Sequence, residues 1–296
     1  MVRNVVLTGF MGTGKSTVGR VVADRLGFEF VDTDHLIEAR HGPIPEIFAA
    51  QGEAAFRELE HEVATELAER SSVVVSTGGR LLLDPRNVAP LSETGRVVCL
   101  TASVDTILAR VSADGLGERP LLSGEDPRGR IEQLLSDRAP AYACFTQVIT
   151  DGLAAEEVAD EVLAAVTAEP ITERRPDGST LSTGTGILPL VRRDGDVLVV
   201  VADPGVHPLI VASLGRAAVL GPGDDAALRA ALAEGATALV VVGSAETWQA
   251  ATRVDRAPRS VFCPTDPASA DIVLATTTST LGPIEVVVDA LAQTAE

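Results

Sequence analysis

Residues 9–16 read Gly-Phe-Met-Gly-Thr-Gly-Lys-Ser and directly follow a short apolar run, Asn-Val-Val-Leu-Thr, at residues 4–8. The run predicts a buried parallel strand, and the apolar spacing of residues 16–26 predicts a helix. The pattern G-x-x-x-x-G-K-[ST] between a strand and a helix is typical of a phosphate-binding loop. A glycine-rich turn that matches by chance is the alternative. We favour the phosphate-binding loop because strand, loop and helix fall in register.

The chemistry of this loop depends on its residue types. The glycines allow backbone N–H groups to point at phosphate oxygens, and the following helix adds the positive end of its dipole. Lys15 is placed to reach the β- and γ-phosphates, and the Ser16 hydroxyl to complete a Mg²⁺ shell. Lys15 is also the only lysine among 24 Lys and Arg residues, which favours a role that a guanidinium fills poorly. The ATP-binding residues expected here are Gly12, Thr13, Gly14, Lys15, Ser16 and Thr17.

Length and composition suit two domains with full apolar cores: 296 residues, 46% hydrophobic, with a mean hydropathy of +0.23. The net charge of −18 argues against nucleic acids and acidic membranes as partners. Cys99, Cys144 and Cys263 lack metal-ligand spacing, so we expect reduced core thiols in a cytoplasmic protein. We expect no signal peptide, because a strand begins within a few residues of Met1, and no apolar stretch reaches the roughly 18 residues that span a bilayer.

Short apolar runs at residues 28–31, 73–76, 96–100 and 147–150 alternate with helical patterns and predict a three-layer α/β/α parallel sheet. In such sheets ligands bind outside the carboxyl ends of the strands. Asp32 and Asp34 follow the second strand and suit metal or hydroxyl chemistry, although an Asx turn with a helix N-cap also explains them. Gly78 and Gly79 follow the third strand and allow a ligand close to the backbone, or serve only a turn.

Two arginines stand in contexts with two interpretations each. Arg57 lies among acidic residues on an amphipathic helix that ends at Glu69, and the residues alone favour a solvated salt-bridge face. Arg119 lies in Gly-Leu-Gly-Glu-Arg-Pro-Leu-Leu, residues 115–122. A glycine-hinged loop with a cation suits a lid for phosphoryl transfer, because closure excludes water and the arginine neutralises developing charge. An ordinary surface loop is the alternative.

Together these motifs resemble the shikimate kinases, small P-loop kinases of the nucleoside-monophosphate-kinase type. The resemblance covers about residues 1–168 and rests on six segments in order: 9–17, 32–34, 56–60, 76–79, 119–122 and 138–142. It implies an ATP-dependent phosphotransferase that phosphorylates the 3-hydroxyl of shikimate, with Mg²⁺ as cofactor and ATP as co-substrate. It also implies a place in the shikimate pathway of aromatic amino-acid biosynthesis and a monomeric kinase domain.

The resemblance implies roles for single residues as well. Asp34 would accept a hydrogen bond from the substrate hydroxyl and assist its deprotonation, with Lys15 and Arg119 as the other catalytic residues. Arg57 and Arg138 would grip the substrate carboxylate, a task that suits the guanidinium fork. The remaining residues would be Gly78 and Gly79 at the substrate, Arg110 stacked on adenine, Arg119 on the phosphates, and Ser16 and Asp32 at the metal.

Arg80 departs from the family, whose run has a third glycine at this position. If the position requires a positive φ, an arginine there costs about 1–2 kcal/mol of strain. Arg80 could cover the acceptor pocket, bind an extra acidic group, or point to solvent. Two rival functions therefore stay open: a paralogous kinase for a related cyclic polyol or amino-shikimate in specialised metabolism, and a catalytically weak nucleotide sensor.

The second half of the chain predicts a linker at residues 169–196 and a small α/β domain at 197–296. We expect a parallel sheet there, with a strand at 271–275 and a terminal helix from about residue 283. Val199–Leu214 faintly resembles the opening of dehydroquinate synthase, but the stretch is too short for that enzyme, and His207 alone cannot supply its metal site. Residues 221–223 favour a turn with an N-cap over a binding loop, and residues 276–282 a loop over a polar pocket. A degenerate, regulatory or interaction module fits these features best.

Overall fold

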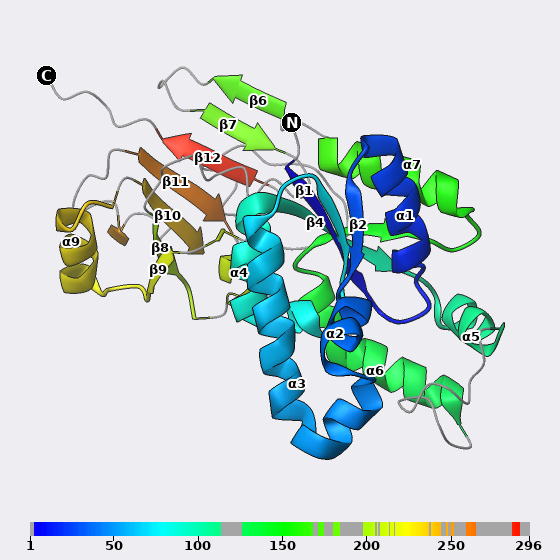
Figure 1. Ribbon diagram of the computed structural model, residues 1–296. Coiled ribbons are helices and arrows are strands. Elements are labelled where there is room, and N and C mark those ends of the chain that lie inside the picture. Colours follow the sequence, from blue (N-terminus) through cyan, green and yellow to red (C-terminus); the bar gives the residue numbers. More distant parts are fainter. Residues whose placement is uncertain are drawn as a thin grey trace, which may run out of the picture. The chain divides into compact units, whose positions relative to one another are not determined.

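The computed structural model describes most of the first half of the chain and parts of the second (Figure 1). The described residues are 3–113, 126–167, 171–174, 180–183, 198–204, 206, 208–212, 214–215, 217–236, 238–243, 247, 250–251, 259–264 and 286–290. The chain divides into two compact units, Met1–Thr167 and Ala168–Glu296.

Five parallel strands form the sheet of the first unit. They are β1 (Asn4–Gly9), β2 (Glu29–Asp32), β3 (Val73–Ser76), β4 (Gly95–Thr101) and β5 (Thr146–Ile149). Their order is β2-β3-β1-β4-β5, and every neighbouring pair is parallel. All residues of β1 and β3 are buried, as expected for central strands of a sheet covered on both faces. The predicted parallel α/β sheet is confirmed.

Helices lie on both faces of this sheet. They are α1 (Lys15–Leu26), α2 (Thr33–His41), α3 (Ile44–Glu69), the 3-10 helix η1 (Leu81–Leu83), α4 (Pro85–Thr94), α5 (Val104–Ala113), α6 (Pro127–Tyr142) and α7 (Ala155–Thr167). One buried cluster joins Val5 and Leu7 of β1 to Val22 of α1 and Val162 of α7. Side chains alternate along a strand, so Val6, also fully buried, points to the other face. Figure 1 shows α3 and α4 on the side of the sheet away from α1 and α7.

Two local features of the first unit go beyond the sequence predictions. Gly52 leaves the helical conformation inside α3 (φ 82°, ψ 175°), so α3 consists of two helical segments. The sequence patterns predicted no element at residues 81–94, where η1 and α4 lie. The signal for α4 was present, because Asp84 caps its first turn by accepting from Arg86 N at 2.9 Å and Pro85 stands at its start.

The second unit contains a mixed sheet of seven strands. They are β6 (Ile171–Arg174), β7 (Thr180–Thr183), β8 (Leu198–Ala202), β9 (Ala217–Leu220), β10 (Ala238–Gly243), β11 (Arg259–Pro264) and β12 (Val286–Ala290), in the order β6-β7-β12-β11-β10-β8-β9. The strands β8 to β11 pair in parallel, whereas β12, β7 and β6 pair antiparallel. Helices α8 (Pro208–Ala212) and α9 (Asp225–Ala233) belong to this unit, and Leu228 of α9 packs on Val199 and Val241.

Three expectations for this unit need correction. The sheet is mixed and not purely parallel, and the proposed linker at 169–196 contains β6 and β7, which pair with each other, while β7 also pairs with β12. The expected terminal helix is a strand at Val286–Ala290, where three consecutive β-branched valines favour strand over helix. The expected strand at 271–275, the segment 276–282 and His207 lie outside the described residues. Residues 221–223 form a turn before α9, where Gly221 N donates to Asp224 Oδ2 at 3.1 Å.

Two cysteines of the first unit are free thiols, Cys99 buried and Cys144 half-buried. Burial raises the pKa of Cys99 to about 12 and that of Cys144 to about 11, which keeps both protonated and unreactive. Cys263 lies in β11. Within the described ranges, no helix is both long and apolar enough to cross a membrane.

Candidate active site

The phosphate-binding loop connects β1 to α1 and is closed by its own polar contacts. Gly14 takes a left-handed conformation (φ 92°) at the N-terminus of α1, which a residue with a Cβ would adopt only with strain. Thr13 Oγ1 donates to Phe10 O at 2.8 Å, and Lys15 Nζ donates to the same oxygen at 3.0 Å. The first backbone N–H groups of a helix have no partner within the helix, so the loop and α1 can together receive an anion.

Ser16, Asp32 and Ser76 place oxygen atoms together beside this loop. Ser16 Oγ donates to Asp32 Oδ2 at 2.7 Å and lies 3.2 Å from Ser76 Oγ. Hard oxygen donors of this kind suit Mg²⁺, which takes few protein ligands and completes its shell with water and phosphate. Among the described residues no cluster of three or more His, Cys, Asp or Glu could hold a metal. The oxygen donors of Ser16 and Asp32 fit Mg²⁺ that arrives with a nucleotide.

The contacts of Asp32 fit both interpretations that the sequence left open, a helix N-cap and a metal ligand. Its Oδ1 caps α2 by accepting from Asp34 N at 3.1 Å and His35 N at 3.4 Å. Its Oδ2 accepts from Ser16, so one carboxylate both ends β2 and faces the phosphate-binding loop. The N-cap thereby fixes the position of the possible metal ligand.

Asp34 lies in the first turn of α2 and is half-buried. Burial and the nearby carboxylate of Asp32 raise its pKa from 3.8 to about 6, although the Lys15 charge acts in the opposite direction. A carboxylate with a pKa near 6 remains ionised at neutral pH and accepts a proton more readily than an exposed aspartate. Asp34 is therefore suited to act as a general base.

Gly78 and Gly79 lie in the turn after β3, where hydrogen bonds connect them to α2 and α6. Gly78 N donates to Thr33 Oγ1 at 2.9 Å, and Tyr142 Oη donates to Gly79 O at 2.8 Å. A Cβ on Gly78 would lie 2.5 Å from Asp34 Oδ1, so only glycine lets this turn approach that carboxylate. The structure thus brings the segments after β2 and β3 together, as expected from their adjacent positions in the sheet.

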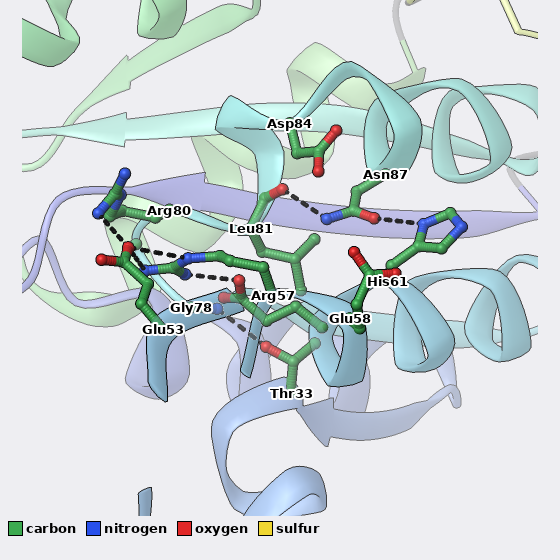
Figure 2. A network of polar contacts seen from close by, with 12 residues as sticks. Thr33, Glu53, Arg57, Glu58, His61, Gly78, Arg80, Leu81, Asp84 and Asn87 are labelled. Carbon is green, nitrogen blue, oxygen red and sulfur yellow. Dashed lines mark hydrogen bonds and ion pairs between the residues drawn. The ribbon is translucent and has the colours of Figure 1, made fainter. Parts of the chain in front are cut away.

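Arg57 of α3 lies between Glu53 and Glu60, and Figure 2 shows its bonds to Glu53. Its Nη1 donates to Glu60 Oε2 at 2.5 Å, and its Nη2 donates to Glu53 Oε1 at 2.9 Å. The Glu60 side chain is only 2% exposed, and burial raises its pKa although Arg57 lowers it. Glu60, one of the two acidic partners of Arg57, is buried. Arg57 therefore does not lie on a fully solvated salt-bridge face.

Arg138 of α6 is 7% exposed and lies over the Phe10 ring, with 5.2 Å between the guanidinium carbon and the ring centroid. A Cβ on Gly79 would lie 3.5 Å from one of its terminal nitrogens. Burial raises the pKa of the neighbouring Tyr142 to about 12, although Arg138 lowers it. A buried cation thus lies beside the Gly78–Gly79 turn and the phosphate-binding loop.

Arg110 of α5 connects the phosphate-binding loop to the segment after β5. Its Nη1 donates to Gly12 O at 3.2 Å and to Thr150 Oγ1 at 2.9 Å, and its Nη2 donates to Thr150 O at 2.8 Å. Thr17 is exposed in the first turn of α1. Arg119 lies outside the described residues.

Arg80 begins η1 with φ −118° and ψ −8°, an ordinary conformation for a residue with a side chain. The strain considered for an arginine at this position therefore does not arise. Its Nη1 donates to Glu53 Oε1 at 2.7 Å, and its side chain is 48% exposed. Arg80 thus shares an acidic partner with Arg57.

A second set of contacts fixes α3 against this turn (Figure 2). His61 Nδ1 lies 2.9 Å from Asn87 Oδ1, and the buried Asn87 donates through Nδ2 to Leu81 O at 2.9 Å. These bonds link the helix of Arg57 to the segment after Gly78 and Gly79.

Sequence reasoning missed several residues of the site. Glu60 stands three residues after Arg57 in the segment 56–60, a spacing that places both on one helix face. Ser76 ends β3 next to the end of β2, a position that the predicted sheet could have indicated. Glu53 stands four residues before Arg57, a helical spacing that indicates their ion pair. Its bond to Arg80, and the bond of Thr150 to Arg110, join residues distant in sequence and left no local signal.

The arrangement defines a class of protein. A parallel sheet with a phosphate-binding loop, oxygen donors suited to Mg²⁺, a carboxylate of raised pKa at the turn after β3, and the buried cation of Arg138 beside that turn is the construction of a P-loop kinase. The family model for shikimate kinase matches residues 11–167, and the chain belongs to the shikimate kinase family.

Relatives agree with this assignment. A shikimate kinase from Symbiobacterium thermophilum is 44% identical over 163 residues, which are 54% of this chain and 94% of the relative. One from Geobacter sulfurreducens is 48% identical over 166 residues, 55% of this chain and 91% of the relative. The solved structure of shikimate kinase from Acinetobacter baumannii in complex with shikimate is 39% identical with a TM-score of 0.52, and it covers 55% of this chain and 92% of the other.

Proposed function

We propose that this protein transfers the γ-phosphoryl group of ATP to the 3-hydroxyl of shikimate, a step of the shikimate pathway. The observation that carries the proposal is the position of Asp34, a half-buried carboxylate with a pKa of about 6 between the phosphate-binding loop and the Gly78–Gly79 turn. Membership of the shikimate kinase family supports the choice of acceptor.

The nucleotide side of the site is built on the loop. Backbone N–H groups of residues 12–17 hold the phosphates, and Lys15 leaves Phe10 O to reach the β- and γ-phosphates. Ser16 would hold Mg²⁺ directly and Asp32 through water, and the bound ion would offset the charge of the phosphate oxygens. Arg110, fixed by Gly12 and Thr150, presents its guanidinium plane to the adenine, and Arg119 closes on the phosphates.

The acceptor side is built on the cations and Asp34. Arg57 and Arg138 bind the acceptor carboxylate, and the backbone of Gly78 and Gly79 contacts its ring hydroxyls. Asp34 accepts the proton of the attacking hydroxyl, a role that requires its ionised form. The protein mainly positions the reactants, as in other phosphoryl transfers.

The setting of the reaction is also part of the proposal. We place the enzyme in the cytoplasm, where Cys99 and Cys144 stay reduced, with a monomeric kinase unit that ends near residue 168. A net charge of −18 opposes nucleic-acid and acidic-membrane partners.

An acceptor panel tests the proposal against a kinase for a related cyclic polyol and against a nucleotide sensor. The purified full chain is given Mg·ATP with shikimate, amino-shikimate, quinate or gluconate, and kcat/KM is measured for each. We expect shikimate to be preferred, because the chain belongs to the shikimate kinase family; all four acceptors carry the carboxylate that Arg57 and Arg138 bind, so that group does not separate them. Preference for another acceptor contradicts the assignment to shikimate, and ADP release independent of every acceptor contradicts kinase activity.

A further inference from the structure

One carboxylate oxygen in the acceptor site is shared by two arginines. Glu53 Oε1 accepts from Arg57 Nη2 at 2.9 Å and Nε at 3.3 Å, and from Arg80 Nη1 at 2.7 Å. Figure 2 shows both guanidinium groups pointing toward this carboxylate from different elements. The Glu53 side chain is 53% exposed, so its ion pairs with Arg57 and Arg80 lie partly in solvent.

The contacts of Arg57 show which of its partners can be exchanged. Its Nη1 is held by Glu60, which is 2% exposed and would be left as an unpaired buried charge if the bond broke. Its Nε and Nη2 atoms form the edge that binds a carboxylate bidentately, and both donate to Glu53. An incoming carboxylate can reach that edge only by displacing Glu53.

We propose that Glu53 competes with the acceptor carboxylate for Arg57 and that Arg80 holds Glu53 aside once the acceptor binds. Arg80 is suited to this because it already bonds to Oε1 and begins the segment directly after Gly79. A displaced Glu53 that stays paired with Arg80 repels the acceptor less than an unpaired one. Glu53 and Arg80 are thus positioning residues that set KM for the acceptor. The inference rests on the proposed function, in which Arg57 binds the acceptor carboxylate.

The expected effects are those of partly exposed ion pairs. Glu53→Gln removes the competing charge and lowers KM for shikimate about two- to fivefold, the size that such pairs contribute. Arg80→Gly returns Glu53 to Arg57 and raises KM by a similar factor. Arg80→Gln does the same without loosening the backbone. In the Glu53→Gln background both Arg80 variants lose this effect, and kcat stays constant throughout.

The test is a double-mutant cycle on KM and kcat for shikimate at saturating Mg·ATP, with the melting temperature of each variant as a check on folding. Glu58→Gln is the matched control, because Glu58 lies on the same helix but pairs with the exposed Arg86; its KM should equal that of the parent. Lower KM for Arg80→Gly in both backgrounds would show that Arg80 obstructs the pocket and would overturn the proposal. Additive effects of the two substitutions would overturn it too.

A separate variant distinguishes failure of this inference from failure of the proposed function. Arg57→Lys keeps the charge but loses the bidentate edge, so it should raise KM for shikimate more than any Arg80 variant. If it does and the cycle is additive, Arg57 binds the acceptor but Glu53 does not compete. If KM is unchanged in Arg57→Lys, Arg57 does not bind the acceptor carboxylate. The proposed competition between Glu53 and that carboxylate is then refuted as well.

Discussion

Asp34 should destabilise the folded kinase unit at the pH where it serves catalysis. Burial and Asp32 raise its pKa from 3.8 to about 6, so the folded state holds a proton on Asp34 that the unfolded chain has already lost between about pH 4 and pH 6. Stability from this group is therefore lost as the pH rises through that window. Two pKa units correspond to about 3 kcal/mol of unfolding free energy. Above about pH 6 the folded state has lost this whole amount.

Asp34→Asn removes the ionisable group while keeping its shape. The variant should therefore be more stable than the parent by an amount that grows to about 3 kcal/mol between pH 4 and pH 7.5. The same substitution should lower kcat about 10²- to 10⁴-fold, because a general base is lost. In the parent, kcat/KM should fall as the pH drops below about 6, as Asp34 becomes protonated.

Amide hydrogen exchange of the buried strands β1 and β3 measures the opening free energy of this unit apart from that of the second unit. Parent and variant are compared at the same pH without nucleotide, so the intrinsic exchange rates cancel. Asp24→Asn, on an exposed position of α1, controls for the removal of one negative charge. The reasoning would be refuted if the stability difference between variant and parent did not change with pH. It would also be refuted if the variant lost stability relative to the parent as the pH rose from 4 to 7.5.

Three further predictions rest on the contacts of the site and on the extent of the first unit. Arg57→Ala leaves the buried Glu60 without its partner, so thermal or urea unfolding should show a loss of about 3–5 kcal/mol; a loss of less than 1 kcal/mol would mean that water replaces the arginine. Gly78→Ala places a Cβ 2.5 Å from Asp34 Oδ1 and should lower kcat about 100-fold by displacing it. Gly79→Ala, whose Cβ would make an ordinary 3.5 Å contact with Arg138, should lower kcat less, and equal losses would contradict the steric reason. A chain that ends at Thr167 should keep the kcat and KM of the full chain, because the relatives match that unit over most of their own length; a slow or insoluble product would show that the two units share an interface.

Much of the first unit could be predicted from sequence because its signals are local. Continuous apolar runs such as residues 4–8 identify buried parallel strands, and the loop motif fixes the connection from β1 to α1. The neighbouring positions of β2 and β3 then bring Asp34 to Gly78. That Asp32 is both an N-cap and a partner of Ser16 is a property of the fold, which spacing alone leaves as two alternatives.

The remaining features depend on interactions between distant residues. Arg80 and Glu53 are 27 positions apart, and whether residue 80 needs a positive φ is fixed by the backbone of the turn. In the second unit, β6 and β7 lack the long apolar pattern of central strands; β6 is the edge strand of the sheet and β7 lies next to it. The pairing of β7 with β12 joins residues more than a hundred positions apart, so a local pattern suggested a linker.

The most direct test of the central claim is ADP release by the purified full chain with Mg·ATP, with and without shikimate. We predict rapid release only when shikimate is present, with one shikimate 3-phosphate formed for each ADP. ADP release at the same rate in both conditions would contradict the claim that this protein is a shikimate kinase.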